Sequence, residues 1–482
     1  MLSTNGNSRM TSYRWVICSL LFFATTINYL DRQVLSLTWT DEIVPEFHWT
    51  NSDYGDITAI FSIVYAISML FAGRFVDWLD TKRGFTWAIV IWSIGACLHA
   101  FAGIATSGLL TGKWLVGFTG AAEEIKTVGN VALVASTSVT LFIIARIILA
   151  IGEAGNFPAA IKATAEFFPK KDRGFATSIF NAGATVGALA APLTIPFIAK
   201  EWGWEMAFIV IGGLGFVWLG FWLVMYRKPE EHPRINAAEL AYIQQDYQVN
   251  DAVSGKKIQA RKMPFRQAFK YRQTWAFAVG KFMTDGVWWF FLFWTPAYLS
   301  SVYGLSAKES APQIFVLYLI TLLSIVGGWL PTFFVDKKGM NPYAGRMRAM
   351  LIFAFFPLLT LFAQPLGSIS VWIPVIIIGI AGAAHQAWSA NIFSTVGDMF
   401  PKSAIATITG IGGMAGGVGS YIINKSSGVL FDHAKNTNMK VFGFEGIESG
   451  YFIIFTVCSI AYLIGWVIMK SLVPKYKPIT DL

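Results

Sequence analysis

Residues Asn28-Tyr29-Leu30-Asp31-Arg32 place an acidic and a basic side chain next to each other inside an apolar segment that runs from Trp15 to Leu37. A charge at the centre of a bilayer costs roughly 2.5–3.5 kcal/mol on insertion scales, so ionisable residues in such segments generally serve a function. A later apolar segment carries a second pair, Arg146 and Glu153. We expect these four residues to form a site that binds protons and an anion. The alternative is a set of structural ion pairs that lock helices together.

The composition is that of a helical protein embedded in a membrane. Of the 482 residues, 55% are hydrophobic and only 13% are charged, and the mean hydropathy is +0.54. The apolar runs have the length of about twenty residues that a transmembrane helix requires, and they lack the roughly ten-residue alternation of a membrane β-barrel. We therefore predict an all-α integral membrane protein with about twelve transmembrane helices.

The basic residues mark one side of the membrane. The net charge of +9 does not indicate nucleic-acid binding, because the basic residues are concentrated in every second loop, with Lys82 and Arg83 in one of them and Lys337 and Lys338 in another. By the positive-inside rule these loops, and with them both termini, are expected to face the cytoplasm.

The apolar segments divide into two halves around one charged stretch that contains prolines. We predict a six-helix bundle over residues 1–226, a cytoplasmic linker loop over 227–272 and a second six-helix bundle over 273–482. Glu166-Phe167-Phe168-Pro169 in the first half recurs as Asp398-Met399-Phe400-Pro401 in the second. Internal repeats of this kind are typical of secondary transporters, so we expect two pseudo-symmetric bundles. A polar connection over residues 106–130 has no functional interpretation.

A loop after the second apolar segment resembles the motif that the major facilitator superfamily carries between its second and third helices. The matching residues, which we expect to act as a gating loop, are Gly73, Asp77, Lys82 and Arg83. The chain departs from this motif at Trp78 and Asp80, where the motif has a basic residue and a glycine. We therefore expect this loop to form a weaker gating latch than the complete motif does.

Within this superfamily, two stretches are similar to the anion:cation symporter family. They are residues 28–32 and the run Gly152-Glu153-Ala154-Gly155-Asn156-Phe157-Pro158. The stretches 284–294 and 385–391 resemble the bacterial hexuronate transporters. The resemblance implies a monomeric importer of a hexuronate or similar sugar-acid anion, driven by proton symport through alternating access in the bacterial cytoplasmic membrane. Apart from this anion, protons and lipid, no partner is expected.

The resemblance also assigns roles to the charged residues. It makes Asp31 and Glu153 the proton-coupling carboxylates, Arg146 the partner that shifts their proton affinity, and Arg32 the ligand of the substrate carboxylate, which a guanidinium binds bidentately. Arg146 and Glu153 lie on one helix face but about 10 Å apart along the axis, so each needs another partner. We expect Asp31 to pair with Arg146. Making and breaking this pair would change the proton affinity of Asp31.

Polar and aromatic residues elsewhere in the apolar segments are expected to bind the sugar hydroxyls and ring. If the two halves align through their proline echoes, His385 corresponds to Glu153. Tyr29 and Trp388 are the expected stacking partners of the ring. The residues expected to bind substrate, besides Arg32, are Tyr29, Tyr65, Asn156, His385, Gln386, Trp388, Ser389 and Asn391.

Other functions are less well supported by the sequence. An anion exchanger would clamp a phosphate with arginines from both halves, but residues 274–300 contain Lys281 and no arginine, which favours symport. Lys281 and Asp285 are four residues apart, and we expect a local salt bridge rather than a proton relay. No catalytic motif indicates an enzyme or receptor, and the cysteine spacing predicts no metal site; no cofactor is expected. Sodium coupling and an aldonate substrate remain alternatives.

Overall fold

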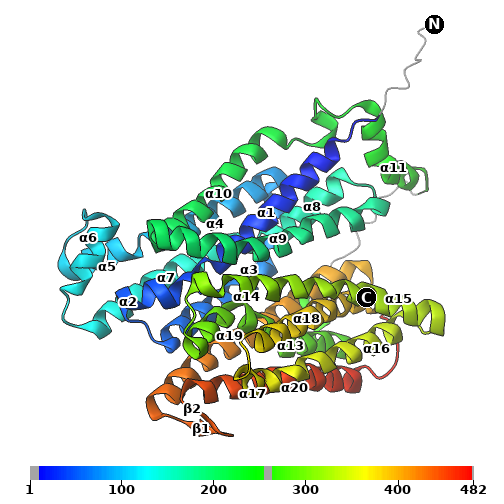
Figure 1. Ribbon diagram of the computed structural model, residues 1–482. Helices are drawn as coiled ribbons and strands as arrows, with labels where there is room; N and C mark the ends of the chain where they lie inside the picture. The colour runs from blue at the N-terminus through cyan, green and yellow to red at the C-terminus, as the bar shows by residue number, and fades with distance from the viewer. Residues whose placement is uncertain (1–9, 254–262, 480–482) are drawn as a thin grey trace.

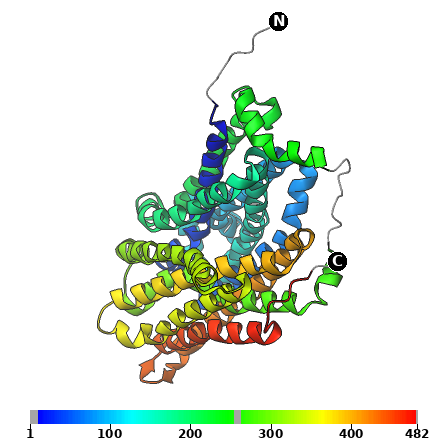
Figure 2. The same cartoon turned by 90° about the vertical axis from the view of Figure 1, so that its right-hand side faces the viewer.

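The computed structural model describes residues 10–253 and 263–479, and at a few helical positions, Lys170 and Lys171 among them, only the backbone. The chain forms two bundles of helices that lie side by side, which is confirmed by both views (Figures 1 and 2). Within the described residues, the β-structure is a hairpin of β1 (Lys440–Val441) and β2 (Phe444–Glu445). The predicted all-α membrane fold is confirmed.

The first bundle contains the long helices that precede the linker. They are α1 (Tyr13–Thr38), α3 (Asn51–Leu79), α4 (Thr81–Ala100), α7 (Val131–Glu153), α8 (Asn156–Phe167), α9 (Lys170–Trp202) and α10 (Trp204–Met225). Shorter elements extend them at one end, namely η1 (Trp39–Ile43), α2 (Val44–Phe47), α5 (Ala102–Thr111) and α6 (Gly117–Lys126). The polar connection 106–130 is therefore mostly helical, because α5 prolongs α4 after a bend of 54°.

The helices of the second bundle are interrupted more often than those of the first. Its helices are α13 (Arg272–Tyr303), α14 (Ala307–Thr321), α15 (Val326–Lys338), α16 (Pro342–Phe355), α17 (Ala363–Gly367), α18 (Trp372–Met399), α19 (Lys402–Thr437) and α20 (Ile447–Leu472). Two 3₁₀ segments, η3 (Leu322–Ile325) and η4 (Phe356–Phe362), connect α14 to α15 and α16 to α17. Each of these connected runs is long enough to span the membrane as one unit.

Up to nine units of the described chain have the length and composition of a membrane span. Eight helical segments are long and apolar enough to cross a bilayer, and the bent pair α4–α5 adds a ninth. The long helices α1, α13 and α19 pack among these segments but are not apolar enough to be counted, so the number of about twelve stays a prediction (Figure 1). Charged residues in α1 and α13 and glycines in α19 lower the apolar character of these three helices.

The internal repeat is visible in the backbone. Pro169 precedes α9 with φ −63° and ψ 157°, and Pro401 precedes α19 with φ −66° and ψ 156°. In each half, the acidic residue three positions before the proline accepts a hydrogen bond from the first turns of another helix. Glu166 accepts one from Thr81 of α4, and Asp398 accepts one from Arg346 of α16. The sequence echo therefore reflects a shared local structure.

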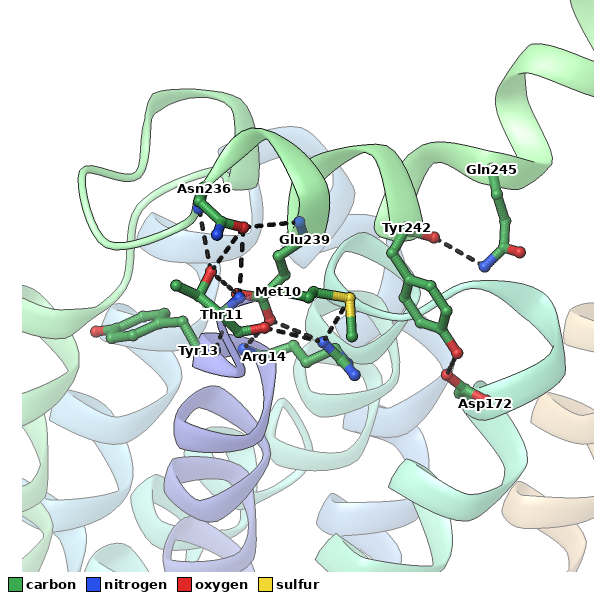
Figure 3. A network of polar contacts seen from close by, with 9 residues as sticks. All are labelled: Met10, Thr11, Tyr13, Arg14, Asp172, Asn236, Glu239, Tyr242 and Gln245. Carbon is green, nitrogen blue, oxygen red and sulfur yellow. Dashed lines mark hydrogen bonds and ion pairs between the residues drawn. The ribbon is translucent and has the colours of Figure 1, made fainter. Parts of the chain in front are cut away.

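The linker contains η2 (Pro229–Glu231) and two helices, α11 (Ala237–Val253) and α12 (Phe265–Ala268), so it is not only a loop. Glu239 of α11 binds the start of α1: it accepts hydrogen bonds from the backbone N–H groups of Tyr13 (3.0 Å) and Arg14 (3.1 Å) and from the Thr11 hydroxyl (2.6 Å) (Figure 3). It also forms an ion pair of 3.0 Å with the Arg14 guanidinium. We call this end of the molecule the linker end, and the opposite end, with β1 and β2, the hairpin end (Figure 1).

Candidate functional site

Arg32 and Glu153 form a buried ion pair between α1 and α7. Arg32 Nη2 lies 2.6 Å and Nε 3.1 Å from Glu153 Oε2, so both nitrogens donate to the same carboxylate oxygen. The side chains are 5% and 0% exposed. At this burial neither charge is stabilised by water, so each depends on the other.

Aromatic rings surround the Arg32 guanidinium. Its Cζ atom lies 5.1 Å from the ring centre of Tyr29, 4.9 Å from Tyr65 and 5.0 Å from Trp289. Phe61 completes the set at 5.7 Å. Three of these rings come from the first bundle and Trp289 comes from α13, so the cation lies where the two bundles meet. Tyr29 and Tyr65 were expected at the site, whereas Phe61 was not.

Asp31 does not pair with Arg146 as expected. Asp31 Oδ2 instead accepts a hydrogen bond of 2.6 Å from Trp92 Nε1 of α4. Neighbouring residues on a helix point about 100° apart, and the rotation of α1 directs Arg32 toward α7 and Asp31 toward α4. Gly152 allows this arrangement, because a Cβ atom there would lie 2.2 Å from the backbone nitrogen of Trp92.

Arg146 lies beside the same cluster without an ion pair in the described chain. Its Cζ atom is 5.3 Å from the ring of Phe61, which also contacts Arg32. Its Nε and Nη1 atoms are buried and make no hydrogen bond to the described protein. The four ionisable residues are thus brought together, although their partners differ from the expected ones.

Several other buried polar atoms around this cluster lack hydrogen-bond partners in the described protein. They include both amide atoms of Asn28 and of Asn156, Asp31 Oδ1 and Glu153 Oε1. Buried polar groups are normally satisfied, and exceptions concentrate where a ligand or water binds. The expected substrate ligand Asn156 is fully buried near the end of α7, where such unsatisfied groups are gathered.

A second polar cluster lies inside the second bundle. His385 Nδ1 is 2.7 Å from the Tyr462 hydroxyl, and the imidazole stacks on Trp288 with ring centres 5.4 Å apart. Trp388 packs edge-on against Tyr462 at 5.5 Å, and its buried Nε1 makes no hydrogen bond to the described protein. Of the two expected stacking residues, Tyr29 therefore borders Arg32, whereas Trp388 belongs to this second cluster.

The three remaining expected residues of α18 differ from one another. Gln386 and Ser389 are half-buried and make no hydrogen bond within the described part of the chain. Asn391 is buried, and its Nδ2 donates to the carbonyl oxygens of Gly327 and Ala387, both at 2.8 Å. The amide of Asn391 is thus occupied by backbone.

Lys281 and Asp285 form the expected local salt bridge. Lys281 Nζ lies 2.8 Å from Asp285 Oδ2 within α13, and the side chains are 6% and 14% exposed. Lys281 also lies over the ring of Phe393, at 4.3 Å from the ring centre. The pair is more deeply buried than a solvated helix face would be.

Comparisons with known proteins identify the family and the fold. The sequence model described as Major Facilitator Superfamily matches residues 21–123 and 127–423. The chain belongs to the Major Facilitator Superfamily. It is accordingly a multi-pass membrane transporter rather than an enzyme. Its fold is similar to that of a D-xylose-proton symporter (TM-score 0.69, 17% identity, 97% of this chain and 100% of that one). It is also similar to a bacterial homologue of the human lysosomal transporter Spinster (TM-score 0.68, 17% identity, 97% and 98%).

Curated relatives from the superfamily transport sugar acids. The chain is 28% identical over 429 residues to the hexuronate transporter of Escherichia coli K12, covering 88% of this chain and 89% of that protein. It is 27% identical over 344 residues to the galacturonate transporter of Dickeya chrysanthemi, covering 70% and 87%. It is 25% identical over 438 residues to the probable galactarate/D-glucarate transporter GarP of E. coli K12, covering 88% and 90%. The chain is thus related to sugar-acid transporters of the superfamily.

The superfamily loop motif binds neighbouring helices of the first bundle. Asp77 lies 3.3 Å from Lys162 Nζ, and Lys82 Nζ donates to the Leu223 carbonyl at 2.9 Å. Arg83 is exposed and Gly73 has open space around it. Asp80, which replaces the motif glycine, has φ +70°, a backbone conformation that favours glycine. Its carboxylate accepts a hydrogen bond from Thr81 N–H and forms an ion pair with Lys228.

Contacts between the bundles close the hairpin end. Asp432 of α19 accepts hydrogen bonds from the backbone N–H groups of Asn51 (3.0 Å) and Ser52 (2.7 Å) at the start of α3. Conversely, Asp41 of the first bundle accepts a hydrogen bond of 2.5 Å from Ala307 N–H at the start of α14. Sequence reasoning missed these residues, because nothing in an isolated aspartate shows which distant helix it will cap.

Proposed function

We propose that this chain imports a hexuronate or similar sugar-acid anion by proton symport through alternating access. The sugar-acid relatives support the substrate class. The chemistry of the buried site supports the coupling, because it combines a guanidinium for a carboxylate, two carboxyl groups for protons and unsatisfied polar atoms for hydroxyl groups.

The ion pair between Arg32 and Glu153 is the observation that carries this proposal. A substrate carboxylate competes with Glu153 for the same guanidinium. If it replaced an ionised Glu153, that carboxylate would remain buried without a counter-charge, at a cost of several kcal/mol. Protonation of Glu153 removes the charge and releases Arg32. Binding of the anion and uptake of one proton at Glu153 therefore favour each other.

Asp31 provides a second proton site in this scheme. It is held by Trp92 and lies next to Arg32 in sequence, so its charge state affects the same buried cluster without competing directly for the guanidinium. The residues with expected roles, Asp31, Glu153, Arg146, Arg32, Asn156 and His385, lie on α1, α7, α8 and α18, and α1 packs against α13 at the seam between the bundles. Rocking of residues 1–226 against 273–482 about this seam would expose the site to either side.

The orientation in the membrane follows from charge. We place the linker end, with Lys82, Arg83, Lys337 and Lys338, in the cytoplasm of a bacterial cell. Both termini are then cytoplasmic, and the closed hairpin end faces the periplasm.

Transport in proteoliposomes tests the proposal. An inward proton gradient is expected to drive accumulation of labelled D-glucuronate above its equilibrium level, and a sodium gradient of equal size is expected to have no effect. Uptake that needs only internal anion, with no response to the proton gradient, would identify an exchanger. Arg32→Ala is expected to abolish binding, and near-normal affinity in that variant would exclude Arg32 as the ligand of the carboxylate.

A further inference from the structure

The buried pair Lys281–Asp285 has no role in the proposed symport cycle. Lys281 is the only buried lysine in the described part of the chain. The salt bridge joins two residues of one helix, four positions apart, so it does not itself fasten α13 to another helix; the Lys281 ammonium also lies over the ring of Phe393 in α18. Removing two charges from water is costly, and a buried ion pair often gives no net stability. Packing therefore does not explain why these residues are ionisable.

The pair lies on the same helix as Trp289, which contacts Arg32. Asp285 and Trp289 are four residues apart and share a helix face, and the Trp289 ring lies 5.0 Å from Arg32 Cζ. Because Lys281 Nζ contacts the Asp285 carboxylate, the ammonium group lies about one helical turn, roughly 6 Å, from Trp289 along the axis. The gap between the two cations is at most this distance plus the 5.0 Å from the Trp289 ring to Arg32 Cζ, which an extended six-carbon chain with a carboxylate at each end can bridge.

Asp285 also lies close to the seam between the bundles. A Cβ atom on Gly416 of α19 would be 2.1 Å from Asp285 Oδ2, and one on the adjacent Gly417 would be 2.1 Å from the side chain of Ala66 in α3. The glycines let α19 approach both neighbours. Asp285 Oδ1 is buried and makes no hydrogen bond to the described protein, so the carboxylate is only partly satisfied.

We propose that Lys281 is a specificity-determining residue that binds a second substrate carboxylate, so that the preferred ligands are six-carbon sugar diacids; this rests on the proposed function of the Arg32 site. Each bundle supplies one buried cation held by its own carboxylate, Arg32 with Glu153 and Lys281 with Asp285. One end of a diacid replaces Glu153 and the other replaces Asp285. Each displaced carboxylate takes up one proton, so a dianion enters with two protons and the buried net charge is unchanged.

Binding of two matched ligands tests this inference. D-Glucarate and D-gluconate differ at one end of the chain, where glucarate has a carboxylate and gluconate a hydroxymethyl group. Titration of each into the purified full chain is followed by intrinsic tryptophan fluorescence, to which Trp288 and Trp289 contribute beside the site. The wild-type protein is expected to bind glucarate about tenfold or more tightly than gluconate, as a charge-assisted hydrogen bond predicts.

The variant Lys281→Gln/Asp285→Asn removes both charges and keeps the side-chain shapes, which protects folding. It is expected to bind both ligands equally, with gluconate affinity within about threefold of the wild type. The matched control Lys440→Gln/Glu445→Gln removes the exposed ion pair of the hairpin and is expected to retain the preference for glucarate.

The possible outcomes separate this inference from the proposed function. A wild-type protein that binds gluconate as tightly as glucarate, or a double variant that retains the preference, overturns the role of Lys281 even if D-glucuronate is transported. A protein that shows the ligand preference but accumulates no sugar acid contradicts proton symport and leaves the role of Lys281 intact. Failure to bind either acid overturns both.

Discussion

Arg32 of α1 holds Glu153 of α7 in a fully buried ion pair, with 2.6 Å between Arg32 Nη2 and Glu153 Oε2. The expected anion ligand is therefore already neutralised by the expected proton acceptor. In the proposed symport cycle this relationship would make proton and anion binding interdependent through one guanidinium. The predictions for the first two variants follow from that proposal.

Glu153→Gln is expected to separate anion binding from protonation. The neutral amide keeps the shape of the side chain but no longer competes as a charge, so substrate affinity should stop falling as the pH rises from mildly acidic to mildly alkaline values. Counterflow should persist and gradient-driven accumulation should be lost. Binding titrations of labelled D-glucuronate at several pH values measure this effect, and a pH dependence equal to that of the wild type would contradict it.

Asp31→Asn is expected to abolish accumulation, to retain counterflow and to leave the pH dependence of binding in place. The reason is that Asp31 bonds to Trp92 and not to Arg32. The same proteoliposomes and titrations measure all three quantities. Retained accumulation would remove Asp31 from the coupling mechanism.

Asn391→Ala is expected to lower stability and not substrate affinity. Pro331 lacks the N–H that would bond the carbonyl of Gly327 four residues earlier in α15, and Asn391 Nδ2 supplies that donor at 2.8 Å. Loss of this bond should cost about 1–2 kcal/mol. Thermal unfolding and the binding titration of the same preparation measure the two effects, and a large loss of affinity with unchanged stability would place Asn391 in the substrate site.

Lowering the pH is expected to release α11 from α1. Burial alone would raise the pKa of Glu239, but hydrogen bonds from Thr11 and from the backbone of Arg14 and Tyr13, together with the Arg14 guanidinium, lower it below its ordinary value. A lowered pKa gives stability that is present above the ordinary value and is lost as the pH falls through the folded value. Hydrogen exchange of α11 should therefore increase under acidic conditions.

Glu239→Gln tests at neutral pH whether Glu239 anchors α11 to α1. Loss of the charge-assisted hydrogen bonds should weaken docking of α11 by about 2 kcal/mol. The control Tyr242→Phe removes the hydrogen bond of 2.7 Å to Asp172 and should have a smaller effect (Figure 3). Equal exchange of α11 in wild type and Glu239→Gln would exclude Glu239 as the anchor.

Local patterns in the sequence predicted that the four ionisable residues Asp31, Arg32, Arg146 and Glu153 lie close together, but not how they pair. Ionisable residues in apolar segments marked Arg32 and Glu153, because their burial is costly in any arrangement. The choice between Arg32 and Asp31 as the partner that faces α7 depends on the rotation of α1, which is set by its packing against α9 and α10. The repeat at Pro169 and Pro401 was readable because proline fixes φ locally.

The contacts that join distant helices were not predictable in the same way. Glu239 and Asp432 each satisfy free N–H groups at the start of a helix more than two hundred residues away in sequence. An acidic residue near a helix start stabilises its dipole wherever it comes from. Only the assembled bundles show which acid reaches which helix.

Asp432 and Asp41 form a reciprocal latch at the hairpin end, since each caps the first turn of a helix in the opposite bundle. Both capped helices already have a capping box of their own, Thr50 with Asp53 in α3 and Ser306 with Glu309 in α14. The bonds from the opposite bundle are therefore not needed to form the helices. Their effect is to hold the bundles together, and they must break when this end opens.

Asp432→Asn is expected to shift the conformational equilibrium toward opening of the hairpin end by about tenfold, because the three hydrogen bonds that its carboxylate accepts from Asn51 and Ser52 are weakened. Hydrogen exchange should increase at the starts of both α3 and α14, although only α3 loses its direct partner. The control Asp53→Asn weakens the capping box within α3 and should increase exchange there alone. If Asp432→Asn also affects α3 alone, the two caps act independently, and Asp432 serves to cap a helix and does not latch the bundles.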